Sequence, residues 1–293
     1  MKNKLSLFAV PYVGWMSIFV VAPIIIMVVY AFSTAAGGFS LENFARMGTY
    51  TAVFTRSFKL AIIATLIALL IGYPVSYMLS KEGPQVQRIA MVLIMLPMWM
   101  NFLLRTYSWM SILENNGLLN QLFQQIGLID LYNQIAMHFA SDPAAYVPID
   151  HFQMIGTQGA VVLGMVYNYL PFMILPIYSV LVKLDHSLIE AARDLGASSV
   201  QVFRKVILPL SLPGVLSGIT MVFVPSVSTF AISRLLGGGT QMMLGDLIEQ
   251  QFLGGAYNPQ LGAAIALVMM AIVVVCMLVM NRFGDGEEQA VML

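Results

Sequence analysis

Six long apolar runs constrain this chain more than any other feature of its sequence. An α-helix needs about 20 mostly apolar residues to cross the roughly 30 Å hydrocarbon core of a bilayer. Only 10% of the 293 residues are charged, whereas soluble domains carry about 25%. The sequence therefore predicts an all-α polytopic membrane protein with a single transmembrane domain. Its six helices are expected at about 7–32, 57–80, 89–113, 158–183, 207–233 and 260–282.

The first run follows Lys2 and Lys4 and is longer than the 7–15 apolar residues of a signal peptide. It also lacks a small-residue cleavage site, so we expect it to stay in the membrane as an anchor. The formal net charge of zero provides no basic face for nucleic acid. The single cysteine, Cys276, excludes an intramolecular disulfide and, within an apolar run, is expected to be a small buried hydrophobe.

Lysine and arginine predict the orientation of the chain in the membrane. With the N-terminus in the cytoplasm, more of these residues fall on the cytoplasmic side than on the outer side, in agreement with the positive-inside rule. The longest loop, about 114–157, has acidic residues but neither lysine nor arginine, so we place it outside. Six spans then leave both termini in the cytoplasm.

The outer loop itself carries a helical pattern. Apolar side chains recur there at helical spacing, with polar residues between them, and the pattern predicts an amphipathic helix. Such a helix lies on the outer membrane surface or across the mouth of the bundle. The residues that carry the pattern are Leu118, Leu119, Leu122, Phe123 and Ile126.

Several kinds of chemistry are missing from the sequence. No lysine follows a glycine, so a phosphate-binding P-loop is excluded. His138, His151 and His186 are scattered without metal-ligand spacing, and we expect no metal site. No Gly-x-Ser-x-Gly elbow is present, so the chain is not expected to be an enzyme.

The stretch 187–209 is rich in polar residues and in signals for helix starts and ends, whereas most of the chain is apolar. Ser187 and Glu190 have the spacing of a capping box, which predicts a helix over about 188–195. Gly196 then occupies the position where helices end in a left-handed residue. One stripe of this helix is apolar, and Arg193 and Asp194 sit away from it. The stripe consists of Leu188, Ala191, Ala192 and Leu195.

A second short helix is expected to begin at Ser198 or Ser199 and to end at the membrane junction near Pro209. Its expected apolar face consists of Val200, Phe203, Val206 and Ile207. Two short helices joined at a glycine elbow would thus lie under the membrane. Small alanines would let another surface approach closely, although the same alanines could instead pack on the chain's own spans.

This stretch resembles the EAA loop of ABC importer permeases. That pattern is Glu-Ala-Ala, three residues, Gly, nine residues, Ile, any residue, Leu-Pro. Here the only departure is valine for isoleucine. The matching residues are Glu190, Ala191, Ala192, Gly196, Val206, Leu208 and Pro209.

The resemblance implies a type I ABC importer permease whose cytoplasmic coupling helix, about 187–205, docks on an ATP-binding subunit. ATP and Mg²⁺ would be bound by a dimer of that partner, with no cofactor in this chain. The residues expected to couple to the ATPase are Ser187, Glu190, Ala191, Ala192, Arg193, Asp194, Gly196, Leu208 and Pro209.

Stretches such as 96–107, 169–185 and 235–252 are similar to the spermidine/putrescine permeases. This resemblance implies a polyamine substrate, a second permease subunit, an extracytoplasmic solute-binding protein and a bacterial cell membrane. Other small solutes, such as ferric ion or thiamine, stay open because their importers share the architecture. A channel or secondary transporter would need no docking loop, and an intramembrane enzyme would need a reactive pair within the bilayer.

A polyamine is a flexible chain of ammonium groups, which bind to aromatic faces and carboxylates. Arg105 opposes a polycation path, because a central arginine costs about 2.5–3.5 kcal/mol on insertion scales and usually pairs within the bundle. Arg105 could lie near the outer interface, where this cost is lower, or form a gate contact with an acid such as Glu249. The candidates for the substrate path are Trp99, Asn101, Arg105, Tyr107, Trp109, Tyr167, Tyr169, Phe230, Asp246 and Glu249.

Overall fold

The computed structural model describes residues 11–34, 36–139 and 146–291. Residues 7–10 of the first predicted span, Lys2 and Lys4, and residues 140–145 of the outer loop lie outside this range. Within the described residues every regular element is a helix or helical turn, apart from one isolated bridge between Ser33 and Phe39. The predicted all-α fold is confirmed.

The described chain is helical from residue 11 to 16, and further helical elements follow along it; η1 and η3 are π-helical turns and η2 is a 3₁₀ turn. They are η1 (Ser17–Val21), α2 (Ala22–Ala31), α3 (Glu42–Arg46), η2 (Met47–Tyr50), α4 (Thr51–Ser80), α5 (Pro84–Trp99), α6 (Phe102–Leu113), α7 (Leu118–Gln125), α8 (Leu128–Phe139), α9 (Gln158–Leu181), α10 (His186–Asp194), α11 (Ser199–Val202), η3 (Phe203–Ile207), α12 (Leu208–Ser228), α13 (Ala231–Leu236), α14 (Leu244–Leu253) and α15 (Pro259–Val291).

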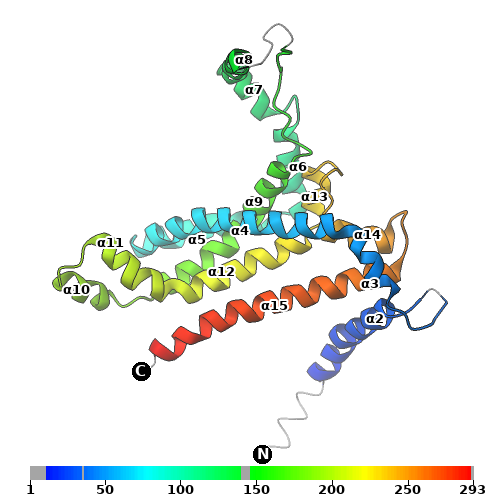
Figure 1. Ribbon diagram of the computed structural model, residues 1–293. Coiled ribbons are helices and arrows are strands. Elements are labelled where there is room, and N and C mark those ends of the chain that lie inside the picture. The colour runs from blue at the N-terminus through cyan, green and yellow to red at the C-terminus, as the bar shows by residue number, and fades with distance from the viewer. Residues whose placement is uncertain (1–10, 35, 140–145, 292–293) are drawn as a thin grey trace, which may run out of the picture.

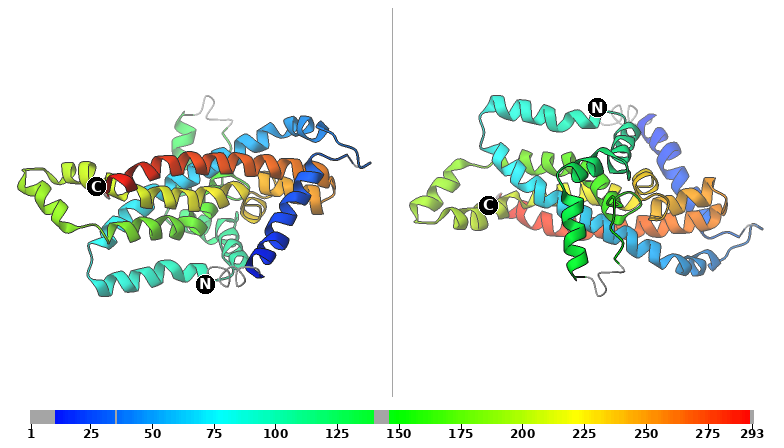
Figure 2. Two further views of the ribbon diagram at one scale, coloured as in Figure 1. Left: turned by 90° about the horizontal axis from the view of Figure 1, so that it is seen from below. Right: turned by 90° about the horizontal axis from the view of Figure 1, so that it is seen from above.

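Long helices form a bundle whose two ends differ. Among the described residues, five helical runs are long and apolar enough to cross a membrane, and a bent pair of helices is a sixth candidate. α10 and α11 lie at one end of the bundle, where α15 also ends, whereas α3 and α14 lie at the other (Figures 1 and 2). The five runs are Pro11–Ala31, Glu42–Ser80, Gln158–Leu181, Ser199–Ser228 and Pro259–Met280.

The centre of the bundle is made of α4, α9 and α12, which lie side by side and contact one another in all three pairs. Small residues let their backbones approach closely. A Cβ atom added at Gly214 of α12 would lie 2.8 Å from the carbonyl oxygen of Pro176 in α9, and one at Gly72 of α4 would lie 2.9 Å from Cγ of Met173. Membrane helices associate largely through such close packing, since lipid offers no hydrophobic drive between them.

Hydroxyl groups add buried hydrogen bonds between the same three helices. The Tyr73 hydroxyl of α4 and the Ser211 hydroxyl of α12 are 2.8 Å apart. Ser76 of α4 donates to the carbonyl of Ile174 in α9 at 3.0 Å. These bonds satisfy groups that have no water to bind in a bilayer.

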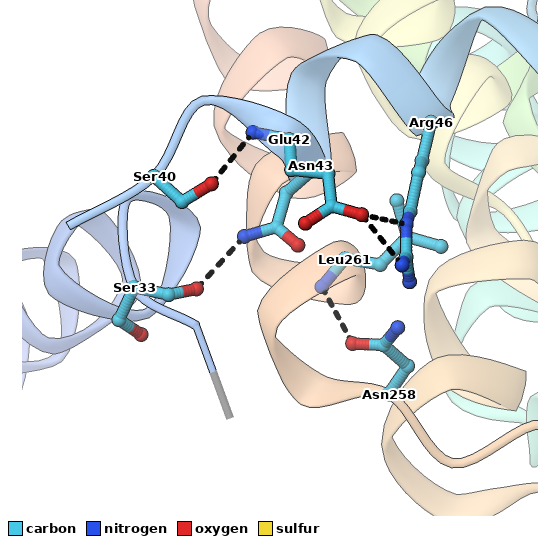
Figure 3. Close-up of polar contacts among 7 residues, drawn as sticks. All are labelled: Ser33, Ser40, Glu42, Asn43, Arg46, Asn258 and Leu261. Carbon is cyan, nitrogen blue, oxygen red and sulfur yellow. Dashed lines mark hydrogen bonds and ion pairs between the residues drawn. The ribbon is translucent and has the colours of Figure 1, made fainter. Parts of the chain in front are cut away.

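At the end of the bundle opposite α10, polar contacts join α3 to the end of α2, and a separate one caps the start of α15 (Figure 3). The buried amide of Asn43 donates to the carbonyl oxygens of Ala31 and Ser33, each at 3.0 Å. Asn258 accepts from the backbone amide of Leu261 at 3.1 Å and so caps the first turn of α15. Asn43 thereby ties the loop between α2 and α3 to both helices, and apolar packing of Ala31 and Phe44 on Ala263 and Ala264 holds this corner to α15.

The third predicted span, 89–113, is divided between two helices. α5 ends at Trp99, and the following helical segment turns away by 90°. Met100 has an extended backbone, and the Asn101 side chain accepts from the amides of Leu103 and Leu104 at 2.9 and 3.3 Å. Asn101 is therefore the N-cap that begins α6, and a polar cap within an apolar run is the signal that marks the break.

The outer loop holds two helices where the sequence predicts one. Gly127, with φ of +74°, separates α7 from α8 because a left-handed residue ends the first helix. Both helices are amphipathic, as expected, and they project sideways from the bundle as an arm (Figure 1). Apolar side chains such as Leu122 and Ile135 are about half exposed on it.

The fifth predicted span also ends earlier than expected. α12 stops at Ser228 rather than near residue 233, because Thr229 has an extended backbone. The first turn of α14 packs against this break, and a Cβ atom at Gly245 would lie only 2.4 Å from the carbonyl oxygen of Ser228. Two short helices, α13 and α14, therefore fold back at this end of the bundle.

The glycine contact between α9 and α12 generates a stability prediction. Gly214→Ala forces the two backbones apart, and overpacking of this kind costs about 1–3 kcal/mol. We expect a lower midpoint of thermal unfolding in detergent. Gly14→Ala is the matched control, because it also places a methyl group in a membrane helix but has nothing within 4 Å. Equal midpoints for the two variants would contradict the close contact.

Candidate coupling site and translocation path

α10 begins two residues earlier than the sequence predicts. The Asp185 side chain accepts from the backbone amide of Ser187 at 2.9 Å, so Asp185 is the N-cap of the helix. Glu190 is then the fifth helical residue, too far along to return to the cap amide. The predicted capping box of Ser187 and Glu190 is therefore wrong, because an aspartate just upstream takes the capping position.

The end of α10 is the predicted glycine elbow. Gly196 has φ of +81°, in the left-handed region that favours glycine. Its amide donates to the carbonyl of Arg193 at 2.8 Å, and the amide of Ala197 donates to the carbonyl of Ala192 at 3.1 Å. This pair of bonds is a Schellman motif, which satisfies carbonyls at the helix end.

The second helix begins at Ser198, one of the two predicted starts. Ser198 and Gln201 form a capping box, with Gln201 accepting from the Ser198 amide at 2.8 Å. After one turn of α11 the chain continues through the π-helical turn η3 into α12. The phase shift of this wide turn contradicts part of the predicted apolar face: Val202 and Ile207 are buried, whereas Val200 is exposed.

The two faces of α10 have different surroundings. Ile189 and Ala192 pack against the apolar cluster between α4, α9 and α12. Leu188, Ala191 and Leu195, which share a stripe at spacings of three and four, are exposed, and Leu195 is 89% exposed. We call these three residues the exposed stripe. Apolar side chains placed this way on a short helix offer a contact surface for another molecule.

The other residues predicted to couple surround this stripe. Ser187, Glu190, Arg193 and Asp194 are exposed on α10. We call residues 186–207, which form α10, α11 and η3, the coupling segment after their predicted role. Leu208 and Pro209 form the first turn of α12, where this segment enters the bundle. The structure thus gathers the predicted set at one end of the molecule, beyond the ends of the central helices (Figure 1).

Part of the predicted substrate path also comes together. Trp109 of α6 and Tyr167 of α9 meet edge to face with ring centroids 5.3 Å apart. The guanidinium carbon of Arg105 lies 6.0 Å from the centroid of Tyr167. Arg105 is buried, and its Nε and Nη1 atoms have no hydrogen-bond partner among the described residues. Buried polar atoms are normally paired, so these two nitrogens lack the acceptors that such atoms usually have, within the part of the chain that the structure describes.

Of the two alternatives for Arg105, the gate contact with Glu249 is not formed. Glu249 of α14 instead pairs with Arg234 of α13 through both of its carboxylate oxygens, with one bond of 3.0 Å from Nη1 to Oε1. The pair is partly exposed. A bidentate pair of guanidinium and carboxylate has a specific geometry. Here the pair joins α13 to α14.

Asp246 is buried and binds the same two helices together. Its Oδ2 atom accepts from the Ser233 hydroxyl and from the backbone amide of Met243, the latter at 2.9 Å. Burial raises the pKa of the Asp246 carboxyl above its ordinary value, although both hydrogen bonds lower it. In this geometry Asp246 caps α14.

The remaining path candidates do not join one site. Trp99, Tyr107 and Phe230 are exposed, and Asn101 caps α6. Tyr169 packs against the apolar clusters of the central helices. Within the described residues no group of three histidine, cysteine or acidic side chains is arranged to hold a metal ion.

Sequence reasoning missed three residues with side-chain partners. Asp185 caps α10, and Ser233 and Arg234 of α13 bind acidic residues of α14. Asp185 could have been found as a helix-start residue just before Ser187. The partners of Ser233 and Arg234 lie 13 and 15 residues along the chain, across a glycine-rich turn. A sequence pattern contains no signal for such pairing.

Comparison with known proteins agrees with this architecture. The pattern of the family described as "Binding-protein-dependent transport system inner membrane component" matches residues 72–286. This chain belongs to that family. It is therefore a multi-pass membrane component of a transport system, and the match includes the whole coupling segment.

Relatives with assigned names are similar along nearly the full chain. The spermidine/putrescine transport system permease protein PotB of Escherichia coli (strain K12) is 34% identical over 281 residues, which cover 93% of this chain and 95% of that protein. PotB of Haemophilus influenzae is 34% identical over 285 residues, with 93% of each chain covered. The inner membrane ABC transporter permease protein YdcU of Escherichia coli is 28% identical and covers 79% of this chain.

Solved structures share the fold. A chain of a bacterial ABC transporter that imports the acidic polysaccharide alginate has a TM-score of 0.72 at 18% identity, with 97% of this chain and 96% of that chain covered. A chain of the MetNI methionine ABC transporter has a TM-score of 0.54 at 19% identity, with 84% and 98% covered. The fold is thus that of ABC importer permeases.

The capping role of Asp246 can be separated from a role for its charge. Asp246→Asn keeps an acceptor for Ser233 and Met243, so we expect the unfolding midpoint to change little. Asp246→Ala leaves two buried donors unpaired and should cost about 1–3 kcal/mol. Thermal unfolding of the two variants measures this difference. A stable Asp246→Asn variant that no longer transports solute would show that the carboxylate charge itself is used.

Proposed function

We propose that this chain is the permease subunit of an ATP-driven importer that moves polyamines, spermidine or putrescine, into the cytoplasm by alternating access. The observation that carries the proposal is the 34% identity to spermidine/putrescine permeases over 93% of the chain. The similarity is spread over the spans as well as the coupling segment. Nothing in this proposal requires chemistry from the chain itself.

ATP would be bound, with Mg²⁺, and hydrolysed by a pair of separate ATP-binding subunits. The support is the form of α10 and α11, which stand at one end of the bundle with Leu188, Ala191 and Leu195 exposed. Two capped helices joined at Gly196 form a rigid unit that would fit a groove on such a subunit. Because η3 continues directly into α12, movement of this unit is transmitted to a central helix.

A second permease subunit would complete the path. α5 is long and apolar, yet none of its described residues is buried. Two nitrogens of Arg105 find no acceptor among the residues that the structure describes. A neighbouring chain that packs on α5 and supplies an acceptor near Arg105 would account for both observations. An extracytoplasmic binding protein would then deliver solute at the opposite end from α10.

The orientation follows from the same arrangement. Basic residues gather near the end of the bundle that carries α10, and cytoplasmic loops are rich in such residues. The α15 helix ends on that side as well (Figure 1). We therefore place both termini in the cytoplasm. The basic residues concerned are Lys81, Lys183, Arg193, Arg204, Lys205 and Arg282.

The aromatic pair of Trp109 and Tyr167 suits an ammonium group, since cations bind to ring faces within about 6 Å. Arg105 beside Tyr167 opposes a free cation at this point, and it opposes thiamine and ferric ion as well as a polyamine, because all three are positively charged. A buried guanidinium repels a polycation at short range. In the polyamine reading, the second permease neutralises Arg105.

Uptake by the reconstituted transporter decides between these substrates. We expect ATP-dependent accumulation of labelled spermidine in proteoliposomes that contain this chain, its partner permease, the ATPase subunits and the binding protein. Unlabelled putrescine should compete, whereas thiamine and ferric ion should not. Competition in the reverse sense would overturn the polyamine assignment but keep the importer. Uptake that proceeds without ATP would overturn both.

Gly196 tests the coupling role separately. Gly196→Val forces a β-branched residue into a left-handed conformation, which strains the elbow by about 1–3 kcal/mol. No atom lies within 4 Å of the added Cβ, so the strain is purely conformational. We expect normal membrane abundance but loss of ATP-dependent uptake. Gly196→Asn is the control, because asparagine tolerates this conformation, and it should keep most uptake. Full uptake by the valine variant would contradict the coupling role.

A further inference from the structure

A cavity of about 300 Å³ lies behind α10, between that helix and the ends of α4 and α9. The cavity is partly enclosed. The face of α10 that lines it differs from the face that carries the exposed stripe. Ile189 and Arg193 of α10 line one wall, and apolar residues of α9 and of the α11–η3 segment line another. The polar side chains on its walls are Tyr77, Ser80, Lys81, Arg193 and Ser199.

The charge of this cavity is one-sided. Lys81 and Arg193 both line it, and none of the described acidic side chains does. Neither cation has a salt bridge with an acid among the described residues. The Lys81 ammonium lies 3.8 Å from the centroid of the Tyr77 ring, which holds the charge at the cavity wall. Two cations at one cavity repel each other, and an anion between them would remove that repulsion.

The donors at the cavity match one class of anion. Arginine presents a fork of N–H groups, lysine presents a compact charge, and both bind phosphate oxygens. The hydroxyl of Ser199 adds a further donor at the wall, whereas that of Ser80 donates to the carbonyl of Tyr77 at 2.9 Å. A volume of about 300 Å³ holds a phosphate group together with part of an attached organic group.

We propose that this cavity is a binding site for a phosphate group, either of a soluble phosphate compound or of an anionic lipid. A bound phosphate would bridge Lys81 at the end of α4 and Arg193 on α10. It would therefore brace the coupling segment against the bundle from the side opposite its docking partner. Anion binding would then change how strongly a movement of that partner displaces α10.

Binding is tested on the full chain, purified with the subunits that accompany it, in nanodiscs of phosphatidylcholine. Inorganic phosphate is titrated against chloride at equal ionic strength, and the midpoint of thermal unfolding is recorded. For a soluble ligand we expect a saturable rise in the midpoint. Lys81→Gln and Arg193→Gln should each raise the half-saturating concentration about tenfold, since each removes a charged hydrogen bond.

Matched variants separate a site from a general charge effect. Arg204→Gln and Lys205→Gln remove neighbouring cations that do not line the cavity, and both should leave the half-saturating concentration unchanged. Lys81→Arg and Arg193→Lys keep the charges and should retain most of the response. These variants also show that a weakened response does not come from misfolding, because each has its own midpoint without phosphate.

A second arm distinguishes the source of the phosphate group. Nanodiscs that contain phosphatidylglycerol are compared with phosphatidylcholine alone, in the absence of free phosphate. Stabilisation by phosphatidylglycerol that Lys81→Gln and Arg193→Gln abolish assigns the site to a lipid headgroup. Stabilisation by inorganic phosphate alone assigns it to a soluble compound. The proposal is overturned if neither anion stabilises the protein, or if Arg204→Gln weakens the response as much as Arg193→Gln.

Discussion

The close approach of α9 to α4 and α12 is the contact on which the rest of the structure depends. Lipid tails are as apolar as leucine, so helices in a membrane gain little from burying large apolar side chains against each other. They gain from backbones that come near enough for many short contacts. Gly72 and Gly214 allow this on the two sides of α9, and the three helices end together where the coupling segment begins. The closely packed ends of α4, α9 and α12 form a rigid surface on which α10 packs.

Local rules made much of the fold and of the coupling segment predictable. Apolar length located the spans, and the conformational freedom of glycine located the elbow at Gly196. Capping chemistry located the start at Ser198. The same chemistry misplaced the start of α10, because Asp185 and Ser187 are both good caps and only the folded chain shows which one is used. Resemblance supplied what local rules could not, namely the identity of the docking partner.

The translocation path was far less predictable, for a physical reason. Apolar residues form both α5 and α6, so the pattern is continuous across a 90° bend that a single asparagine marks. Pairing across space has no sequence period at all. Glu249 could have met Arg105 or Arg234 by charge alone, and the fold-back of α13 on α14 decided for Arg234. Such choices depend on which helices become neighbours, and the packing of small residues settles that.

The π-helical turn η3 has a counterpart in η1, and each ends two residues before a proline, Pro209 and Pro23. Proline has no amide to donate and crowds the carbonyl one turn back, which a wider turn relieves. Each residue advances a helix by about 100°, so the wide turn sets the angle between the coupling segment and α12. Loss of one residue between Gly196 and Pro209 would swing the exposed stripe by about that angle. The direction in which the stripe points is thus encoded by a count of residues, more than by their identities.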